Sequence, residues 1–341
     1  MQPSLKRGLE LIQLGITHKM IKTGLAIIAV LITSFGEVQA QSPYPNKPVT
    51  IVVAYAPGGL GDLLARQMAE KLSIKTKQSF IVENKPGATG ALGSRYVAKA
   101  NPDGYTLLLG QTGELAITPA VTKDLGYNPL KDFRPIALIG EVPLIMVTSN
   151  NSPFKNLAEF IKAAKAKPGG MTYASSGSAT PGHLAAAALC QGVGIDLVHA
   201  PYKGAGPAMT DVLGGHVDVF FSSAPSVIPQ IQSKNLTALA ISSSKRMPTL
   251  PEVRTVSEDE LKGFNFTLWG GLLAPAGTPD AVINFLNSAI NSVLEEPAFK
   301  NPLEKDGILI HVNSSKEFDE FIKRESIKYS QLVKAIGIQA E

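Results

Sequence analysis

Two turns rich in glycine and hydroxyl residues carry most of the chemistry that this sequence can offer. The first reads APGGLGD at residues 56–62, and the second reads SSGSAT at residues 175–180. Glycines leave backbone N–H groups open to a ligand, and the N-terminus of a following helix attracts negative charge through its dipole and its unpaired donors. Each turn therefore predicts an anion-binding site.

Each of these turns joins a predicted strand to a predicted helix. The strands are Val49–Ala54 and Met171–Ala174, and the helices that follow them are Asp62–Leu72 and Pro181–Gln191. Short strands and helices alternate in the same way along the rest of the chain, up to a last predicted strand at Ile308–His311. This alternation is typical of α/β proteins with mainly parallel sheets, whose ligands bind beyond the carboxyl ends of the strands.

Three more turns have the same strand-to-helix form. They read GQTGE at residues 110–114, APYKGAGP at residues 200–207 and SSAPS at residues 222–226. Thr112 and Ser222 offer hydroxyls, while Tyr202 and Lys203 offer an aromatic wall and a mobile cation. One such turn is weak evidence, because ordinary surface turns use the same residues, but together they predict the lining of one shared pocket.

Helix starts and two long apolar segments indicate how the chain is organised. Thr180 and Thr278 each place a capping hydroxyl before a proline at the first helical position, and Ser314 with Glu317 matches a capping box. The segments 136–149 and 266–279 look like crossings between domains, the first of them broken into two strands at Val142-Pro143. We therefore expect a discontinuous domain of residues 41–141 plus 266–341, a second domain of residues 142–265, and a hinge between them.

The N-terminus predicts export. Basic residues up to Lys22 precede an apolar run at Gly24–Phe35, and VQA at residues 38–40 precedes Gln41. The run is shorter than the roughly 20 residues that span a bilayer, so it favours a signal peptide of residues 1–40, cleaved after Ala40, over a membrane anchor. Either Met1 or Met20 can be the start of translation. A net charge of +4 without a basic run argues against nucleic acid as a partner.

A dinucleotide site is the first alternative for the opening turn. Glu83 lies about 20 residues after the glycines, where an acid would meet a ribose hydroxyl. Leu64, however, stands where the third small residue of that pattern belongs, and Asp62 would repel a pyrophosphate. We instead expect Asp62 to pair with Arg66, four residues along the helix, and Glu83 to be structural.

A secreted hydrolase acting on a small carboxylated substrate is the second alternative. The sequence has no G-x-S-x-G elbow around Ser178, and His183 lies inside a predicted helix where a capping or packing role is the commoner one. Cys190 sits in an apolar helix as a core residue, and the histidines lack metal-ligand spacing. We therefore expect no enzyme, no catalytic residue, no cofactor and no metal.

Nearly the whole chain after residue 43 resembles the periplasmic substrate-binding receptors of tripartite tricarboxylate transporters, also called the Bug family. The resemblance rests on ordered stretches rather than on one motif. They are residues 44–66 (YPNKPVTIVVAYAPGG…D…AR), 82–94 (VENKPGATGALGS), 97–110 (VAKANPDGYTLLLG), 127–136 (YNPLKDFRPI), 167–183 (KPGGMTYASSGSATPGH), 199–221 (HAPYKGAGPAMTDVLGGHVDVFF), 239–246 (LAISSSKR) and 268–279 (LWGGLLAPAGTP).

The resemblance implies a fold, a function and a set of contacts. The fold would be a two-domain Venus flytrap of the type II kind, acting as a periplasmic monomer that closes on a small carboxylate and presents it to a membrane permease. The implied ligand contacts are Gly58, Gly59, Leu60, Gly61 and Asp62 in the first turn, and Ser175, Ser176, Gly177, Ala179 and Thr180 in the second. Thr112, Tyr202, Lys203 and Ser222 complete the predicted site.

This chain departs from the family pattern at two places. Many relatives read Gly-Gly-Ser-Thr-Asp in the first turn, where this chain has Leu60 and Gly61 before Asp62, and they commonly carry an acid where it has Ser222. The missing acid removes a partner for an ammonium group, and Leu60 adds apolar surface. We therefore expect a carboxylate ligand without an amino group, either dicarboxylic or aromatic.

Overall fold

The computed structural model describes residues 44–202 and 204–337. The described elements belong to a compact unit that begins at Pro45. The predicted signal peptide, its cleavage site and Lys203 lie outside the described residues. Among the described helices, none combines the length and the apolar character that a membrane crossing requires.

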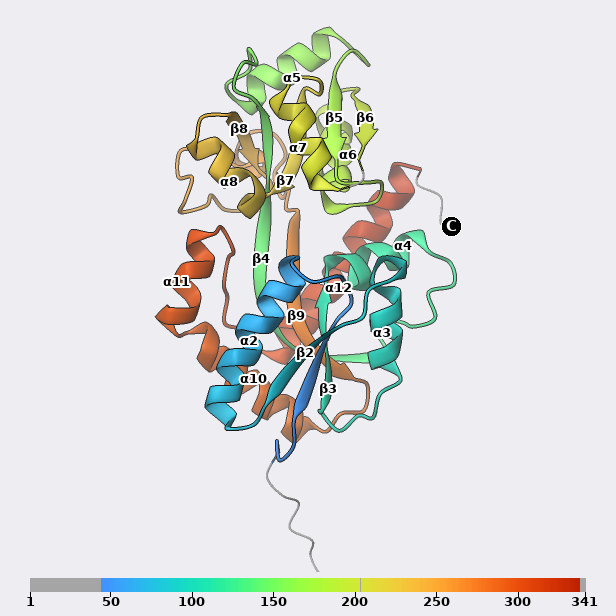
Figure 1. Cartoon of the computed structure of the whole chain (residues 1–341). Coiled ribbons are helices and arrows are strands. Elements are labelled where there is room, and N and C mark those ends of the chain that lie inside the picture. Colours follow the sequence, from blue (N-terminus) through green and yellow to red (C-terminus); the bar gives the residue numbers. More distant parts are fainter. Residues whose placement is uncertain (1–43, 203, 338–341) are drawn as a thin grey trace, which may run out of the picture. The chain divides into compact units, whose positions relative to one another are not determined.

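The first part of the chain forms three parallel strands with helices between them. β1 pairs with both β2 and β3 in parallel, and Figure 1 shows α2 and α3 beside these strands. A π-helical turn, η2, follows β3 directly. The elements are β1 (Val49–Val53), α2 (Leu60–Thr76), β2 (Phe80–Asn84), η1 (Ala88–Gly90), α3 (Ala91–Ala98), β3 (Thr106–Gln111), η2 (Gly113–Ile117) and α4 (Thr118–Val121).

Two long strands, β4 (Phe133–Ser149) and β9 (Thr267–Pro275), correspond to the predicted crossing segments. β4 pairs with β9 as far as Pro143, and from Leu144 onward it pairs with strands of the other half of the sheet. The predicted break at Val142-Pro143 is therefore wrong. Proline is tolerated here because its missing N–H falls where β4 changes partners, and the next amide, of Leu144, donates to Ser242 Oγ at 2.8 Å.

The second half of the sheet is built around the far end of β4. β7 and β8 pair with β4 antiparallel, and β5 lies parallel to both β6 and β7. The elements are α5 (Leu157–Ala166), β5 (Thr172–Ser175), α6 (Pro181–Val193), β6 (Val198–Pro201), α7 (Ala205–Leu213), β7 (Val219–Ser223), α8 (Ala224–Gln232), β8 (Leu236–Ile241) and α9 (Val256–Asp259).

The strand order across the described sheet is β2-β1-β3-β9-β4-β7-β5-β6, with β8 beside β4. Parallel pairs occupy both ends, and the antiparallel pairs all involve β4 or β9. The predicted α/β class with parallel units is confirmed. The domain boundaries at residues 141/142 and 265/266 stay a prediction.

The last helices pack back on the first half of the sheet. They are α10 (Asp280–Leu294), α11 (Pro297–Lys305) and α12 (Ser315–Ala335). The fully buried ring of Trp269 on β9 meets Phe318 and Phe321 of α12 edge to face, and its Nε1 donates to Glu325 Oε2 at 3.1 Å. This contact fixes β9 against α12 and holds the strand from which cavity residues project.

One of the three predicted helix caps is confirmed in full. Ser314 and Glu317 form the expected capping box at α12. Thr180 is the N-cap of α6 without a side-chain cap bond, and Thr278 lies outside α10, its hydroxyl donating to Pro275 O instead. The predicted strand Ile308–His311 is wrong, because only an isolated bridge joins Leu309 to Glu141.

Candidate functional site

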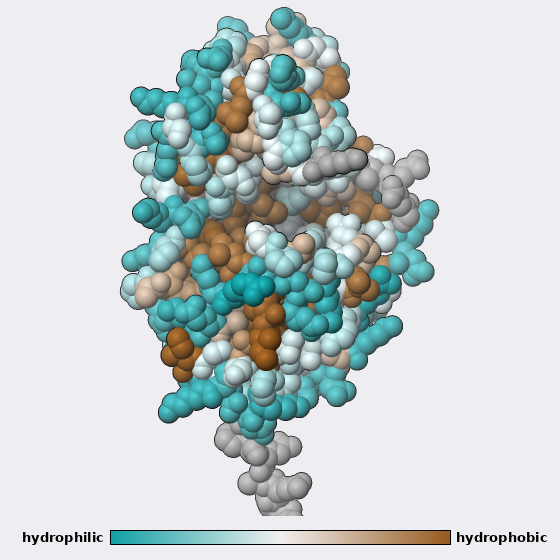
Figure 2. All heavy atoms as spheres, in the orientation of Figure 1, coloured by the Kyte–Doolittle hydropathy of each residue, from teal (hydrophilic) through white to brown (hydrophobic). Residues whose placement is uncertain are grey.

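Four of the five turns predicted from sequence meet at a cavity of about 770 Å³, whereas no described residue of the turn at residues 200–207 lines it. The lining of the cavity includes the starts of α2, α6 and α8, the end of β3, the middle of β4 and the start of β9. Figure 2 shows this hollow with hydrophobic atoms gathered along its wall. The predicted residues that line it are Gly58, Gly59, Leu60, Gly61, Asp62, Thr112, Ala179 and Thr180.

The first turn presents open backbone to the cavity. Gly58 has φ +90°, a conformation that favours glycine, and Gly59 is the N-cap of α2 with φ −85°. A Cβ added to either residue would meet no atom within 4 Å. The first amides of α2 therefore face space that a carboxylate can occupy.

Asp62 shapes this turn from within. Its carboxylate accepts from Gly58 N at 3.0 Å, from Arg66 Nε at 3.0 Å and from Asn84 Nδ2 at 3.0 Å. The predicted pairing with Arg66 is confirmed, at 2.9 Å between Arg66 Nη2 and Asp62 Oδ1. The hydrogen bond from Arg66 is the largest cause that lowers the pKa of Asp62 to about 2. The anionic Asp62 thus accepts the hydrogen bond of the Gly58 amide and neutralises the charge of Arg66.

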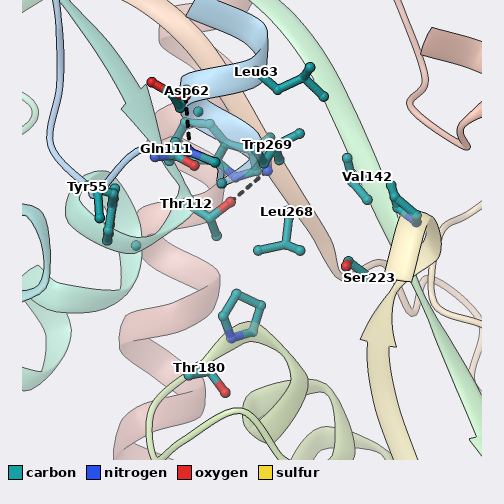
Figure 3. Close-up of a pocket in the computed structure, with 18 of the residues that line it drawn as sticks. Tyr55, Asp62, Leu63, Gln111, Thr112, Val142, Thr180, Ser223, Leu268 and Trp269 are labelled. Atoms are coloured by element: carbon teal, nitrogen blue, oxygen red, sulfur yellow. Dashed lines mark hydrogen bonds between the residues drawn. The ribbon is translucent and has the colours of Figure 1, made fainter. Parts of the chain in front are cut away.

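Gly61 makes room for a residue that sequence reasoning missed, Gln111. A Cβ on Gly61 would lie 2.4 Å from Gln111 Nε2 and 2.6 Å from Gln111 Cδ. Gln111 lines the cavity, and Figure 3 shows it beside Asp62 and Thr112. No described residue is hydrogen-bonded to its side-chain amide. The amide therefore adds a donor next to the first turn of α2.

Thr112, which was predicted as a contact, mainly holds the loop. It is 1% exposed, and its Oγ1 accepts from Trp269 N at 2.8 Å, as drawn in Figure 3. Glu114 Oε1 accepts from Gln111 N at 2.7 Å, and complete burial raises the pKa of Glu114 to about 8. The segment that carries Gln111 is thus anchored on both sides.

The second turn is closed by hydrogen bonds of its own. The hydroxyls of Ser175 and Thr180 both donate to Gly177 O, at 2.9 and 2.8 Å. Ala179 N donates to His183 Nδ1 at 3.0 Å, although Ala179 has the positive φ of +55°. Only Ala179 and Thr180 of this turn reach the cavity; Ser175, Ser176 and Gly177 do not line it.

Two stacked histidines support the second turn from behind. The rings of His183 and His199 lie 3.9 Å apart and nearly parallel, and Tyr173 stacks on His199 at 4.8 Å. His199 Nε2 lies 2.7 Å from Ser175 Oγ. Burial, and to a smaller extent His199, lowers the pKa of His183 to about 4. The predicted structural role of His183 is confirmed by its bond to Ala179.

Two further predicted residues, Tyr202 and Ser222, do not line the cavity. Tyr202 donates its hydroxyl to Asp211 at 2.6 Å, and Ser222 is buried in β7 opposite Ile145 of β4. The next residue, Ser223, lines the cavity in place of Ser222. Lys203 lies outside the described residues. Val142 and Leu268, which were not predicted as ligand contacts, also line the cavity, and Figure 3 shows both beside Ser223.

The pair Ser175–His199 is the arrangement closest to a nucleophile and a base. Ser175 is fully buried and outside the cavity lining, and its hydroxyl is within hydrogen-bonding distance of both Gly177 O and His199 Nε2. Among the described residues, no carboxylate is hydrogen-bonded to His199, so the orienting acid of a triad is missing there. The geometry is that of a hydrogen-bonded turn.

Comparison with known proteins identifies the family. Residues 64–338 match the family described as "Tripartite tricarboxylate transporter family receptor". The chain belongs to this receptor family. Protein BugT of Bordetella pertussis is 33% identical to the receptor over 316 residues, covering 92% of this chain and 97% of BugT.

Solved structures agree with the family assignment. The structure titled "R. palustris Rpa4515 with adipate" has 29% identity and a TM-score of 0.76, covering 87% of this receptor and 99% of that chain. "MatC (Rpa3494) from Rhodopseudomonas palustris with bound malate" has 30% identity and a TM-score of 0.71, covering 85% and 100%. The resemblance to Bug receptors and the two-domain periplasmic-binding fold are confirmed.

Proposed function

We propose that this receptor binds a small carboxylate in the cavity and delivers it to the membrane permease subunits of a tripartite tricarboxylate transporter. One observation carries the proposal: the N-termini of α2 and α6 line the same cavity, and the turn before α2 is open backbone. Aligned amide donors at helix starts favour a carboxylate, most strongly where water is excluded. The bound adipate and malate named for two related structures are consistent with this chemistry.

The binding site in this proposal consists of the predicted residues that line the cavity, together with Gln111 and Ser223. Ser175, Ser176 and Gly177 act as the frame of the second turn. Asp62 holds the first turn in shape, and a ligand carboxylate meets the amides that Asp62 leaves unpaired.

Closure around the ligand is the proposed signal to the permease. The domain of residues 142–265 would close on the domain of residues 41–141 plus 266–341, with β4 and β9 as the hinge segments. Small-angle X-ray scattering with and without ligand tests this: we expect a smaller radius of gyration when the ligand is bound. An unchanged radius at saturation argues against closure.

The proposal also covers processing and location. The chain would be exported to the periplasm and cleaved after Ala40, and it would act there as a monomer. N-terminal sequencing of the protein from a periplasmic fraction is expected to begin at Gln41. A first residue upstream of Lys22 in that fraction contradicts cleavage.

Binding without turnover distinguishes a receptor from the hydrolase alternative. A thermal-shift screen of mono-, di- and tricarboxylic acids, followed by titration calorimetry, is expected to find a ligand that binds with a stoichiometry near one and is recovered unchanged. Hydrolysis of a carboxylate ester, lost in a Ser175→Ala variant, would support the enzyme instead. A complete absence of binding across the panel would contradict the carboxylate site.

A further inference from the structure

The cavity has open backbone amides at the start of α2 and apolar side chains along the adjoining wall. Leu60 and Leu63 of α2, Val142 of β4, Leu268 of β9 and Ile308 all line it. Leu60 is at the same time the first residue of α2, so apolar surface begins directly beside the helix amides. A ligand whose carboxylate meets those amides therefore has its remaining atoms against hydrocarbon.

From this arrangement we infer that the ligand is a monocarboxylate with an apolar body, alkyl or aryl, rather than a dicarboxylate. The inference rests on the proposed function, because it takes the anion position at the start of α2 from it. Beyond the proposed function, the inference specifies that the ligand has one carboxylate and that the rest of the ligand is apolar.

The charges of the lining support a single ligand carboxylate. Among the described residues that line the cavity, Arg66 is the one with a positive charge. Its Nε and Nη2 bind Asp62, and Nη2 also donates to Asn84 Oδ1 at 3.1 Å. Arg66 and Asp62 cancel each other. A second carboxylate against the apolar wall would lose its water without gaining a cation, which is strongly unfavourable.

The wall that the start of α8 forms, with Ser223, Pro225 and Ser226, contributes no charged group. Ser223 Oγ and Ser226 Oγ lie 2.7 Å apart and are hydrogen-bonded to each other. Pro225, between them in sequence, has no N–H to offer at the start of α8. This wall suits a methyl group, a ring edge or a neutral oxygen of the ligand better than it suits a second anion.

Lys203 lies outside the described residues, and neither Tyr202 nor Gly204 lines the cavity. Tyr202 donates to Asp211 and Gly204 N donates to Ser176 O at 3.2 Å. The apolar wall comes from α2, β4, β9 and Ile308, none of which contains this loop.

Matched ligand pairs test the inference in the purified protein by titration calorimetry. Hexanoate and adipate differ by a methyl group in place of a carboxylate, and 4-methylbenzoate and terephthalate differ in the same way. In the better-binding pair, we expect the monocarboxylate to have a dissociation constant lower by about tenfold or more. A dicarboxylate that binds as tightly as its partner, or more tightly, overturns the inference.

A charge placed on the apolar wall should reverse this preference. In Leu268→Arg we expect adipate to gain at least about tenfold relative to hexanoate, because the second carboxylate then finds a cation. Ile74→Arg is the matched control: Ile74 is 69% exposed on α2 and outside the cavity lining, so the same added charge should leave the ratio within about twofold.

The outcomes separate the inference from the proposed function. If a carboxylate binds but the dicarboxylates have the lower dissociation constants, the receptor function is supported and the inference is wrong. If no carboxylate of the panel binds while the protein melts cooperatively, both fall. An unchanged hexanoate-to-adipate ratio in a folded Leu268→Arg protein overturns the placement of the ligand body against β9.

Discussion

The two turns that meet at the cavity are held in different ways. The turn before α2 is fixed by a charged side chain, Asp62, which ties Gly58, Arg66 and Asn84 together. The turn before α6 is fixed by neutral groups: the hydroxyls of Ser175 and Thr180 and the imidazoles behind them. One turn depends on an ionised carboxylate and the other on unprotonated histidine.

This difference has consequences for binding. In the first turn, Asp62 accepts a hydrogen bond from the Gly58 amide, and the amides at the start of α2 remain open to a ligand. In the second turn, Ala179 N is already paired with His183. The first turn is therefore the main anion site, and the second mostly shapes the opposite wall with Ala179 and Thr180.

The largest expected effect comes from an added negative charge in the first turn. Gly59→Asp places a carboxylate beside the amides of α2, where it competes with the ligand and repels it. The site has room for the side chain, and φ −85° suits any residue. We expect the dissociation constant of the best carboxylate to rise by about 100-fold or more, measured by calorimetry.

Gly206→Asp is the control for that substitution. Gly206 lies near the start of α7, an added Cβ meets nothing within 4 Å, and the residue does not line the cavity. The Gly206→Asp variant should bind the ligand with the affinity of the wild type. Unaltered affinity in Gly59→Asp would refute the first turn as the main anion site.

Acid should weaken the second turn first. The folded-state pKa of His183 is about 4, below its unfolded value of about 6.5. The stability that depends on neutral His183 is therefore complete above pH 6.5 and is lost as the pH falls toward 4. This shift corresponds to about 3 kcal/mol of the free energy of unfolding.

Urea denaturation at pH 7 and pH 4.5 measures this loss. In His183→Gln the amide oxygen can still accept from Ala179 N but cannot be protonated, so the difference between the two pH values should shrink. His216→Gln, at an exposed histidine, should leave the difference unchanged. If His183→Gln keeps the wild-type pH dependence, the second turn is not held by a neutral imidazole.

The first turn should yield only at lower pH. The depressed pKa of Asp62 means that its contribution is fully present above pH 4 and is lost as the pH falls through about 2. We expect Asp62→Asn to lower the free energy of unfolding at pH 7 by about 2 kcal/mol, with the deficit shrinking below pH 4.

An exposed ion pair with the same spacing provides the comparison for Asp62. Asp319 pairs with Lys323 four residues along α12, and its side chain is 34% exposed, compared with 8% for that of Asp62. Asp319→Asn should cost less than about 0.5 kcal/mol. Equal losses in the two variants would mean that Asp62 is an ordinary surface pair rather than the frame of the turn.

The sequence allowed the turns to be found but not the direction of each side chain. Strand-turn-helix units follow from local pattern, and so do the Asp62–Arg66 pair and the capping box at Ser314. Adjacent residues at a strand end face opposite sides. Ser222 was predicted as a contact where Ser223 lines the cavity, and Gln111 was missed although the adjacent Thr112 was predicted and also lines the cavity. Only the pairing of β7 with its neighbours decides that Ser223 rather than Ser222 is inside.

Tertiary partners also explain the other errors. Pro143 reads as a strand break, yet β4 continues because two different strands pair with it before and after that residue. The apolar wall comes from Val142 and Leu268, which are ordinary strand residues in sequence. A role that depends on what lies across a cavity leaves no local pattern.

The smallest predicted effect concerns the amide that the sequence did not mark. Gln111→Leu keeps the approximate volume of the side chain and removes its donor, so we expect binding about tenfold weaker, since a hydrogen bond to a charged group is worth roughly 1.5–3 kcal/mol at most. Gln67→Leu is the control: Gln67 also lines the cavity, but it lies beyond the first turn of α2, so this variant should change affinity less than about twofold.

A second substitution tests how Gln111 reaches the ligand. Gly61→Ala should displace the side-chain amide of Gln111, because the added Cβ would meet Gln111 Nε2 at 2.4 Å. If Gln111 acts through the space that Gly61 leaves, then Gly61→Ala has little further effect in the Gln111→Leu background. Additive losses would show instead that the two residues act on the ligand independently and that the first turn binds through backbone alone.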